Sequence, residues 1–190
     1  MIMSSYKLVA FSNRKLCTGS LLEQIDIIAK KKKPDILVLR EKDLSEEEYE
    51  ALAKEVIKKC EKYNIECILH NFIDVSLRLN YKKIHLPLEV LKGNKDKIKG
   101  FEKIGVSTHS VQDAILAESL GADYITAGHI FKTDCKKDLE PRGLKFLSEV
   151  CKSVNIAVFA IGGINDENKI SAIEAGADGI CLMSGFMNIK

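Results

Sequence analysis

Short apolar runs alternate along the chain with longer segments in which apolar residues recur at helical spacing. Most of the runs are apolar at consecutive positions, which is typical of parallel strands buried on both faces. The eight runs span residues 7–11, 36–39, 66–69, 84–86, 103–106, 124–127, 157–161 and 179–183. Eight strands alternating with helices predict an α/β fold, the (β/α)8 TIM barrel. A doubly wound open sheet, which would need fewer strands, is the alternative.

The segments between the runs carry helix signals. Residues 45–63 combine helical spacing with a capping-box pair, Ser45 and Glu48. Ser110 and Asp113 repeat that pair before a later helix. Further helices are predicted over 72–79, over 143–153, and from Asn165 or Asp166 to Gly176.

The end of the chain does not complete this pattern. A full barrel closes with a helix that covers its last and first strands, but only residues 184–190 follow the eighth run. We therefore expect the final C-terminal helix to be missing or replaced. One hypothesis is a homodimer in which a partner subunit covers the gap, and the other is a barrel that is less stable there.

Composition narrows the class of protein. The 190 residues suit one domain, residues 1–190, and 46% apolar residues argue against disorder. A formal net charge of +2 gives no indication of nucleic acid or a membrane surface as partner. No apolar stretch is long enough to cross a membrane and no signal-peptide pattern occurs, so we expect a cytoplasmic protein. The six cysteines show no CxxC spacing, so they are interpreted as free thiols and no metal site is expected.

Active sites of TIM barrels lie at the C-terminal ends of the strands. Gly162 and Gly163 follow the seventh run, and Ser184 and Gly185 follow the eighth. Backbone N–H groups of these two loops commonly bind phosphate, and glycine lets the backbone approach a ligand closely. The alternative is that the glycines only form a turn.

Three other strand ends carry ionisable side chains. His129 follows the sixth run and could exchange protons near neutral pH, although loop histidines are usually just solvated. Arg40 and Lys42 follow the second run and could bind an anion; alternatively, Glu41 and Asp43 neutralise them in an exposed loop. Cys135 has no base fixed beside it by the sequence, and the role of His70 stays open.

Several motifs together resemble the thiamine-phosphate synthase superfamily. They are "LREKDLSEEEY", "HLP", "GVSTHS", "GADYITAGHIFKTDCK", "AIGGIN" and "GADGICLMSG", in the same order from about residue 7 to residue 185. The resemblance implies the (β/α)8 barrel. It also implies one of two activities, the Mg²⁺-dependent synthase or the metal-free thiazole tautomerase of the TenI branch.

Residues at matching positions favour the TenI branch. Where the synthases have an Asn-Asp pair this chain has His70-Asn71, and where they have Gly-Gln-x-Asp it has residues 87–90, Pro-Leu-Glu-Val. Both expected Mg²⁺-binding aspartates are thus replaced. "GHIFKTDCK", with histidine in place of the synthase proline, also resembles TenI.

The resemblance therefore predicts a thiazole tautomerase of thiamine biosynthesis with no cofactor and a small thiazole phosphate as its partner. It assigns the proton transfer to His129 and phosphate binding to the glycine loops. Candidates for the remaining substrate contacts are Arg40, Lys42, Ser107 and Lys136. The alternatives are a thiamine-phosphate synthase with altered metal binding, and a non-catalytic regulatory protein that only binds phosphate.

Overall fold

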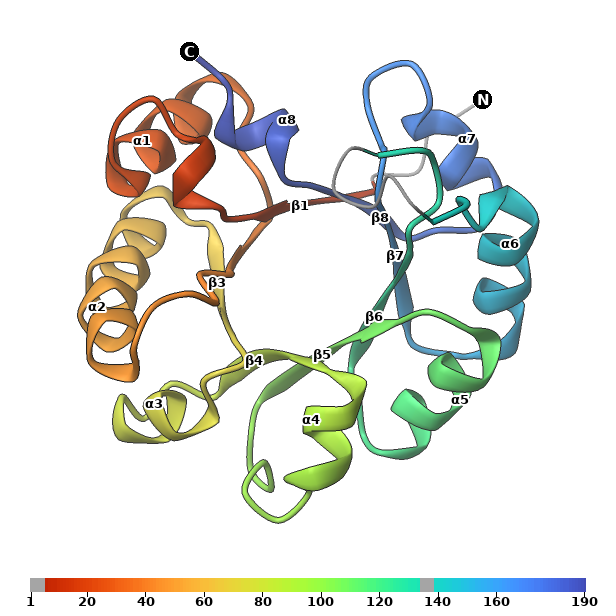
Figure 1. Ribbon diagram of the computed structural model, residues 1–190, viewed down its shortest axis with the longest axis horizontal. Coiled ribbons are helices and arrows are strands. Elements are labelled where there is room, and N and C mark those ends of the chain that lie inside the picture. Colours follow the sequence, from red (N-terminus) through yellow and green to blue (C-terminus); the bar gives the residue numbers. More distant parts are fainter. Residues whose placement is uncertain (1–5, 134–138) are drawn as a thin grey trace.

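A closed barrel of eight parallel strands forms the centre of the computed structural model, which describes residues 6–133 and 139–190 (Figure 1). Strands are hydrogen-bonded in the order β1 to β8, and β8 pairs with β1. The predicted TIM barrel is confirmed. The strands are β1 Lys7–Phe11, β2 Ile36–Leu39, β3 Glu66–His70, β4 Lys83–Pro87, β5 Lys103–Thr108, β6 Tyr124–Gly128, β7 Ala157–Ile161 and β8 Gly179–Leu182.

Helices surround the barrel in the connections between the strands (Figure 1). They are α1 Leu21–Lys31, α2 Glu46–Tyr63, α3 Ile73–Arg78, α4 Leu88–Gly93, α5 Val111–Ser119, α6 Gly143–Ser153, α7 Lys169–Glu174 and α8 Ser184–Met187, with a 3-10 helix η1 at Arg14–Leu16. None of the described helices is long and apolar enough to span a membrane.

The helix caps show why these segments begin where they do. Ser45 and Glu48 form the predicted capping box of α2, with both reciprocal hydrogen bonds present. At α5 the Ser110 side chain accepts from the N–H of Asp113, whose carboxylate instead accepts from the N–H of His109. The second capping box is therefore only half formed.

One helix was not predicted, and another begins later than predicted. No helix was predicted after the fourth run, but α4 begins directly after Pro87. The helix expected from Asn165 or Asp166 begins only at Lys169, because the Asn165 side chain accepts from the N–H groups of Glu167 and Asn168 and forms a turn.

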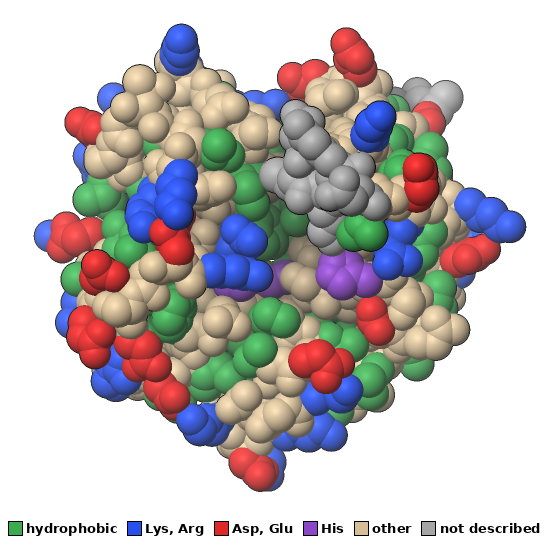
Figure 2. Space-filling model, in the orientation of Figure 1, with side chains coloured by type: hydrophobic (Ala, Val, Ile, Leu, Met, Phe, Trp, Pro, Cys, Tyr) green, Lys and Arg blue, Asp and Glu red, His purple; other side chains and the backbone are tan. Residues whose placement is uncertain are grey.

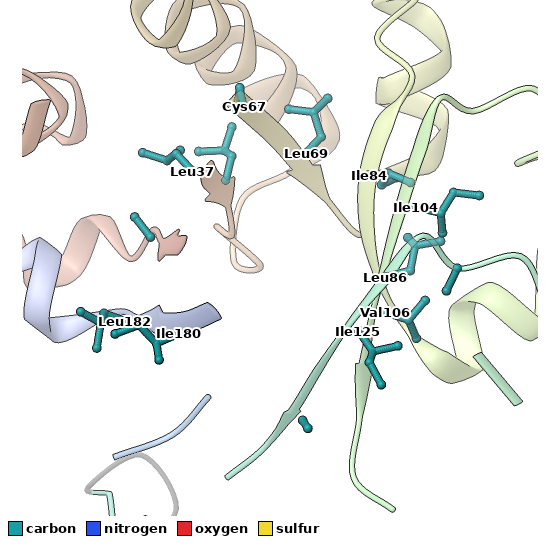
Figure 3. Packing of buried hydrophobic residues seen from close by; sticks show 14 of the residues in the cluster. Leu37, Cys67, Leu69, Ile84, Leu86, Ile104, Val106, Ile125, Ile180 and Leu182 are labelled. Atoms are coloured by element: carbon teal, nitrogen blue, oxygen red, sulfur yellow. The ribbon is translucent and has the colours of Figure 1, made fainter. Parts of the chain in front are cut away.

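The hydrophobic core lies mainly between the barrel and the helices. Figure 3 shows side chains of this layer on the outer faces of the strands, among them Leu37, Leu69, Ile84 and Val106. A second, smaller cluster fills the inside of the barrel. It consists of Val9, Phe11, Ile36, Val38, Ile68, Tyr124, Phe159 and Cys181.

The four-residue helix α8 replaces the missing final helix of the barrel. Its Phe186 and Met187 are fully buried. The Gln24 side chain of α1 donates to the carbonyls of Phe186 and Ile189 at 2.7 and 3.0 Å. The chain thus covers the gap itself, and the homodimer hypothesis loses the reason on which it was based.

Candidate active site

Side chains of successive strand residues alternate between the inside of the barrel and the helices. Ile68 lies in the interior cluster, so His70 also points inward from the C-terminal end of β3. The strand register pairs His70 with His85 of β4. On the other side, Leu39 of β2 pairs with Leu69, which places Arg40 next to His70. Two histidines and an arginine therefore share one level at the mouth of the barrel.

His85 is held on both sides of its ring. Its Nδ1 lies 3.0 Å from the hydroxyl of Tyr124, and its Nε2 lies 2.8 Å from the hydroxyl of Ser107. The side chain is completely buried. Burial, with a smaller contribution from the charge of Lys42, lowers the pKa of His85 to about 3. The imidazole is therefore neutral near pH 7, with one nitrogen donating and the other accepting.

His70 stacks on this fixed ring but is not held in the same way. The two ring centroids are 5.8 Å apart with an interplanar angle of 17°. His70 is 3% exposed, and its Nδ1 is enclosed without a hydrogen-bond partner among the described residues. Burial is the largest cause that holds the pKa of His70 well below its usual range, and electrostatic interactions with His85, Lys42 and Arg40 add to it.

Glu41 does not neutralise its neighbours Arg40 and Lys42. Its buried carboxylate accepts from the Ser12 hydroxyl at 2.7 Å, and from the backbone N–H and the guanidinium of Arg14 at 3.0 Å each. Asp43 likewise pairs with Arg14 and Lys15. The salt-bridged loop considered as the alternative for Arg40 and Lys42 is therefore wrong.

Neither Arg40 nor Lys42 makes an ion pair with any residue that the structure describes. Burial and the charge of Arg40 lower the pKa of Lys42. Figure 2 shows Lys and Arg side chains beside histidines at the centre of the face onto which the strands open. This mouth can attract an anion that offsets the two charges.

His129 directly follows β6 and is 5% exposed. Its Nε2 lies 3.2 Å from the backbone carbonyl of Leu139. A carbonyl can only accept, so Nε2 must carry the proton, and the lone pair of the neutral ring is then on Nδ1. Nδ1 has no hydrogen bond to a described residue. This arrangement prepares His129 to act as a base through Nδ1.

Gly162 and Gly163 have left-handed φ values of 95° and 68°, so both positions favour glycine. A Cβ at Gly162 would lie 2.2 Å from the Cβ of His129, and one at Gly163 would lie 2.4 Å from the Lys132 carbonyl oxygen. Phe131 also donates its N–H to the Gly162 carbonyl. Glycine is thus required here to pack the β7 loop against the β6 loop, a role that the sequence did not indicate.

The phosphate-binding prediction for these loops is compatible with the geometry. Among described residues, the backbone N–H groups of Gly163, Ser184 and Gly185 make no hydrogen bond. β7 pairs with β8 through Ile161 and Cys181, so the two loops begin side by side. Ser184 and Gly185 are exposed, and a Cβ at Gly185 would meet no atom closer than 3.5 Å.

The predicted residues thus fall into two groups at one end of the barrel. Arg40, Lys42 and Ser107 surround the histidine pair on the β2–β5 side, whereas His129 and the glycine loops lie on the β6–β8 side. Lys136 and Cys135 lie outside the described residues. His109 links the β5 and β6 loops, because its Nδ1 lies 2.9 Å from the Gly128 carbonyl oxygen.

The polar contacts of His85 and Tyr124 inside the barrel were missed from the sequence. Their signal is weak but readable: "KIHLP" alternates, with His85 between two apolar residues that face the helices. Tyr124 simply continues an apolar run. Its inward direction, shared with Phe159, follows from the barrel register and not from the run itself.

A separate cavity of about 690 Å³ lies at the opposite end of the barrel, where the strands begin. Its carboxylates are already engaged: Glu66 pairs with Lys83 and Lys103, and Asp35 accepts from the N–H of Leu8. Charged contacts at this end of a barrel are typical of stability, not catalysis.

Comparisons with known proteins agree with the fold. The chain matches the family described as "Thiamine monophosphate synthase" over residues 8–186. It is 36% identical to the thiamine-phosphate synthase of Clostridium novyi over 190 residues, which cover 96% of this chain and 91% of the relative. The chain belongs to the thiamine-phosphate synthase family of thiamine biosynthesis.

Comparisons with two further relatives cover a similar share of this chain. The thiamine-phosphate synthase of Clostridium acetobutylicum is 35% identical over 192 residues, with 97% of this chain and 89% of the relative covered. The structure of thiamine phosphate pyrophosphorylase from Pyrococcus furiosus superposes with a TM-score of 0.82 at 29% identity. That superposition covers 96% of this chain and 88% of the other.

The Mg²⁺ that the synthase activity implies does not fit the side chains at its expected positions. After β3 these side chains belong to the buried His70 and to Asn71. The backbone N–H of Asn71 donates to the His85 carbonyl. After β4 the nearest carboxylate is Glu89, which is 79% exposed and pairs with Lys92. Mg²⁺ prefers carboxylate oxygens in near-octahedral arrangement, and neither loop of this family member offers one at the mouth.

Proposed function

We propose that the protein is a thiazole tautomerase, which converts a carboxylated thiazole phosphate tautomer into its aromatic form. The observation that carries this proposal is the state of His129. Its Nε2 lies 3.2 Å from the Leu139 carbonyl, so Nε2 is the donor and the lone pair of the neutral ring is on Nδ1. A base held in one tautomer suits a reaction that only moves a proton.

The reaction needs one proton to leave and one to return. Nδ1 of His129 takes the proton from the ring carbon that carries the carboxylate. The electron pair of the broken C–H bond moves through the ring to the exocyclic double bond. The exocyclic carbon then receives the proton back from the imidazolium, which leaves an aromatic ring and a neutral histidine. Atoms and charge balance without any other reactant.

The charged groups around the mouth support the same assignment. Arg40 and Lys42 can bind an anionic group of the substrate, because their neighbouring carboxylates are engaged elsewhere. The backbone N–H groups of Gly163, Ser184 and Gly185, which make no hydrogen bond to a described residue, can donate to the phosphate on the β7–β8 side. The two groups of the site would thus bind the two ends of the substrate.

A change of His129 to Ala or Gln tests the proposal. Loss of a general base typically lowers the rate by about 100- to 10,000-fold. The conversion can be followed by the absorbance change as the thiazole becomes aromatic. The control is Ser119→Ala, because the exposed Ser119 hydroxyl donates to the Leu116 carbonyl and makes no other hydrogen bond among the described residues. A His129→Ala variant with the wild-type rate would contradict the mechanism.

Thiamine-phosphate synthase activity is the second candidate, because the similar relatives carry that name. The assay supplies pyrimidine pyrophosphate, thiazole phosphate and Mg²⁺ and measures thiamine phosphate. We expect no turnover above background, since the carboxylates that would hold the metal are replaced. Sustained multiple turnover would make the synthase the better assignment.

A further inference from the structure

His70 presents an enclosed polar ring without a partner. Its Nδ1 is buried and makes no hydrogen bond among the described residues, whereas His85 beside it is bonded through both nitrogens. An unpaired polar atom in such a place costs about 1–3 kcal/mol. A bound ligand can offset this cost by supplying the bonding partner that the described chain itself does not.

The position of His70 indicates the chemistry of that partner. It ends β3 at the mouth, one position across from Arg40, and it lies within the electrostatic reach of Lys42. Neither cation has an ion-pair partner among the residues described in the structure. Two positive charges beside a neutral ring attract an anion, and a protonated imidazole would add a third donor to it.

We propose that His70 contacts the substrate and binds its carboxylate together with Arg40 and Lys42, taking up a proton from solvent as this anion arrives. The proposal rests on the proposed tautomerase function, which provides a ligand with a carboxylate at one end and a phosphate at the other. It makes His70 a group that distinguishes carboxylated from uncarboxylated thiazoles.

Burial first, and then the groups that face His70, lower its pKa and keep the ring neutral before the ligand binds. His85 packs against it from β4, and Arg40 and Lys42 face it from the loop after β2. The hydroxyl oxygen of the fully buried Tyr49 of α2 accepts from the backbone N–H of His70 at 2.8 Å, and the hydroxyl donates to the Leu39 carbonyl at 2.6 Å. Burial raises the pKa of Tyr49, so this neighbour of His70 stays neutral. An incoming carboxylate offsets the cations and favours the protonated ring.

Calorimetric titration measures the proton directly. Binding heats at pH 7 in two buffers of different ionisation enthalpy give the number of protons taken up. The probes are the aromatic thiazole phosphate with the ring carboxylate and the same compound without it. Wild type should take up on the order of one proton with the first probe and almost none with the second.

Two variants identify His70 as the group responsible. His70→Asn and His70→Gln keep a polar side chain but cannot take up a proton. Both should abolish the proton uptake and weaken binding of the carboxylated probe by about tenfold or more, as expected for a lost hydrogen bond to a charged group. Binding of the uncarboxylated probe should change by less than about twofold on the same reasoning. Ser119→Ala is the matched control, and thermal melts establish that each variant is folded.

The outcomes separate this proposal from the proposed function. Proton uptake that persists in both His70 variants, that equals uptake with the uncarboxylated probe, or that is missing in wild type overturns the proposal. A wild type that fails to bind the carboxylated probe overturns it as well. Carboxylate-linked uptake that depends on His70, in a protein without tautomerase turnover, supports this proposal and rejects the function.

Discussion

At the scale of single residues, Gly162 after β7 determines how closely the backbone of the β7 loop packs against His129. Gly162 has a left-handed φ of 95°, and a Cβ there would lie 2.2 Å from the Cβ of His129. A side chain at this position therefore has to displace the histidine that the proposed mechanism uses.

Gly162→Ala should consequently lower both stability and activity. Strain at such a φ costs about 1–3 kcal/mol, and a shift of the catalytic group can cost about 100-fold in rate. Urea unfolding and the tautomerase assay measure the two effects. Gly93→Ala is the control, because a Cβ there meets nothing within 4 Å and its φ is not positive. An active, fully stable Gly162→Ala variant would show that the β6 loop is not held by this contact.

At the scale of elements, Glu41 connects the loops after β1 and β2. Its buried carboxylate binds the Ser12 hydroxyl and both the backbone and side chain of Arg14. Glu41→Ala should destabilise the protein by about 1–3 kcal/mol, because buried donors lose their acceptor. The exposed Asp43→Asn should cost less than about 1 kcal/mol, as surface ion pairs do. Chemical denaturation compares them, and equal losses would contradict a special role for Glu41.

The short helix α8 depends on a side chain from the other end of the chain. Gln24 of α1 is 3% exposed and donates to the carbonyls of Phe186 and Ile189. Gln24→Ala removes both hydrogen bonds and leaves the Ile189 carbonyl without a partner among the described residues, whereas the Phe186 carbonyl keeps the N–H of Ile189. The loss should cost about 1–3 kcal/mol. The exposed Gln112→Ala on α5 should stay within about 0.5 kcal/mol of wild type. Equal unfolding midpoints for the two variants would show that α8 does not need this anchor.

Elements were predictable from the sequence to different degrees for physical reasons. Parallel strands buried on both faces give continuous apolar runs, so all eight were located, several with their observed bounds. The six-residue α4 was missed, because a helix of under two turns has almost no periodicity to detect. α7 began late because Asn165 forms a turn of its own. The predicted strand ends indicated which residues lie at the mouth of the barrel. Which of these residues are neighbours depends on the register between the strands, and the sequence pattern does not contain the register.

At the scale of the whole molecule, the histidine pair links stability to pH. Burial lowers the pKa of His85 to about 3 and holds that of His70 well below its usual range. In the unfolded chain both rings titrate at about pH 6.5. Below that pH the unfolded state therefore binds protons that the folded state does not, so acid favours unfolding.

The free energy of unfolding should fall steeply as the pH is lowered, because both His70 and His85 contribute. From pH 6.5 down to the folded pKa values, each ring lowers the free energy of unfolding by up to about 1.4 kcal/mol per pH unit. Urea unfolding at pH 7.5, 6 and 5 should show this slope in wild type and about half of it in His70→Asn. Ser119→Ala removes no titratable group and should retain the wild-type slope. A wild-type slope in His70→Asn would mean that His70 is already protonated in the folded protein, which would also remove the basis for proton uptake on ligand binding.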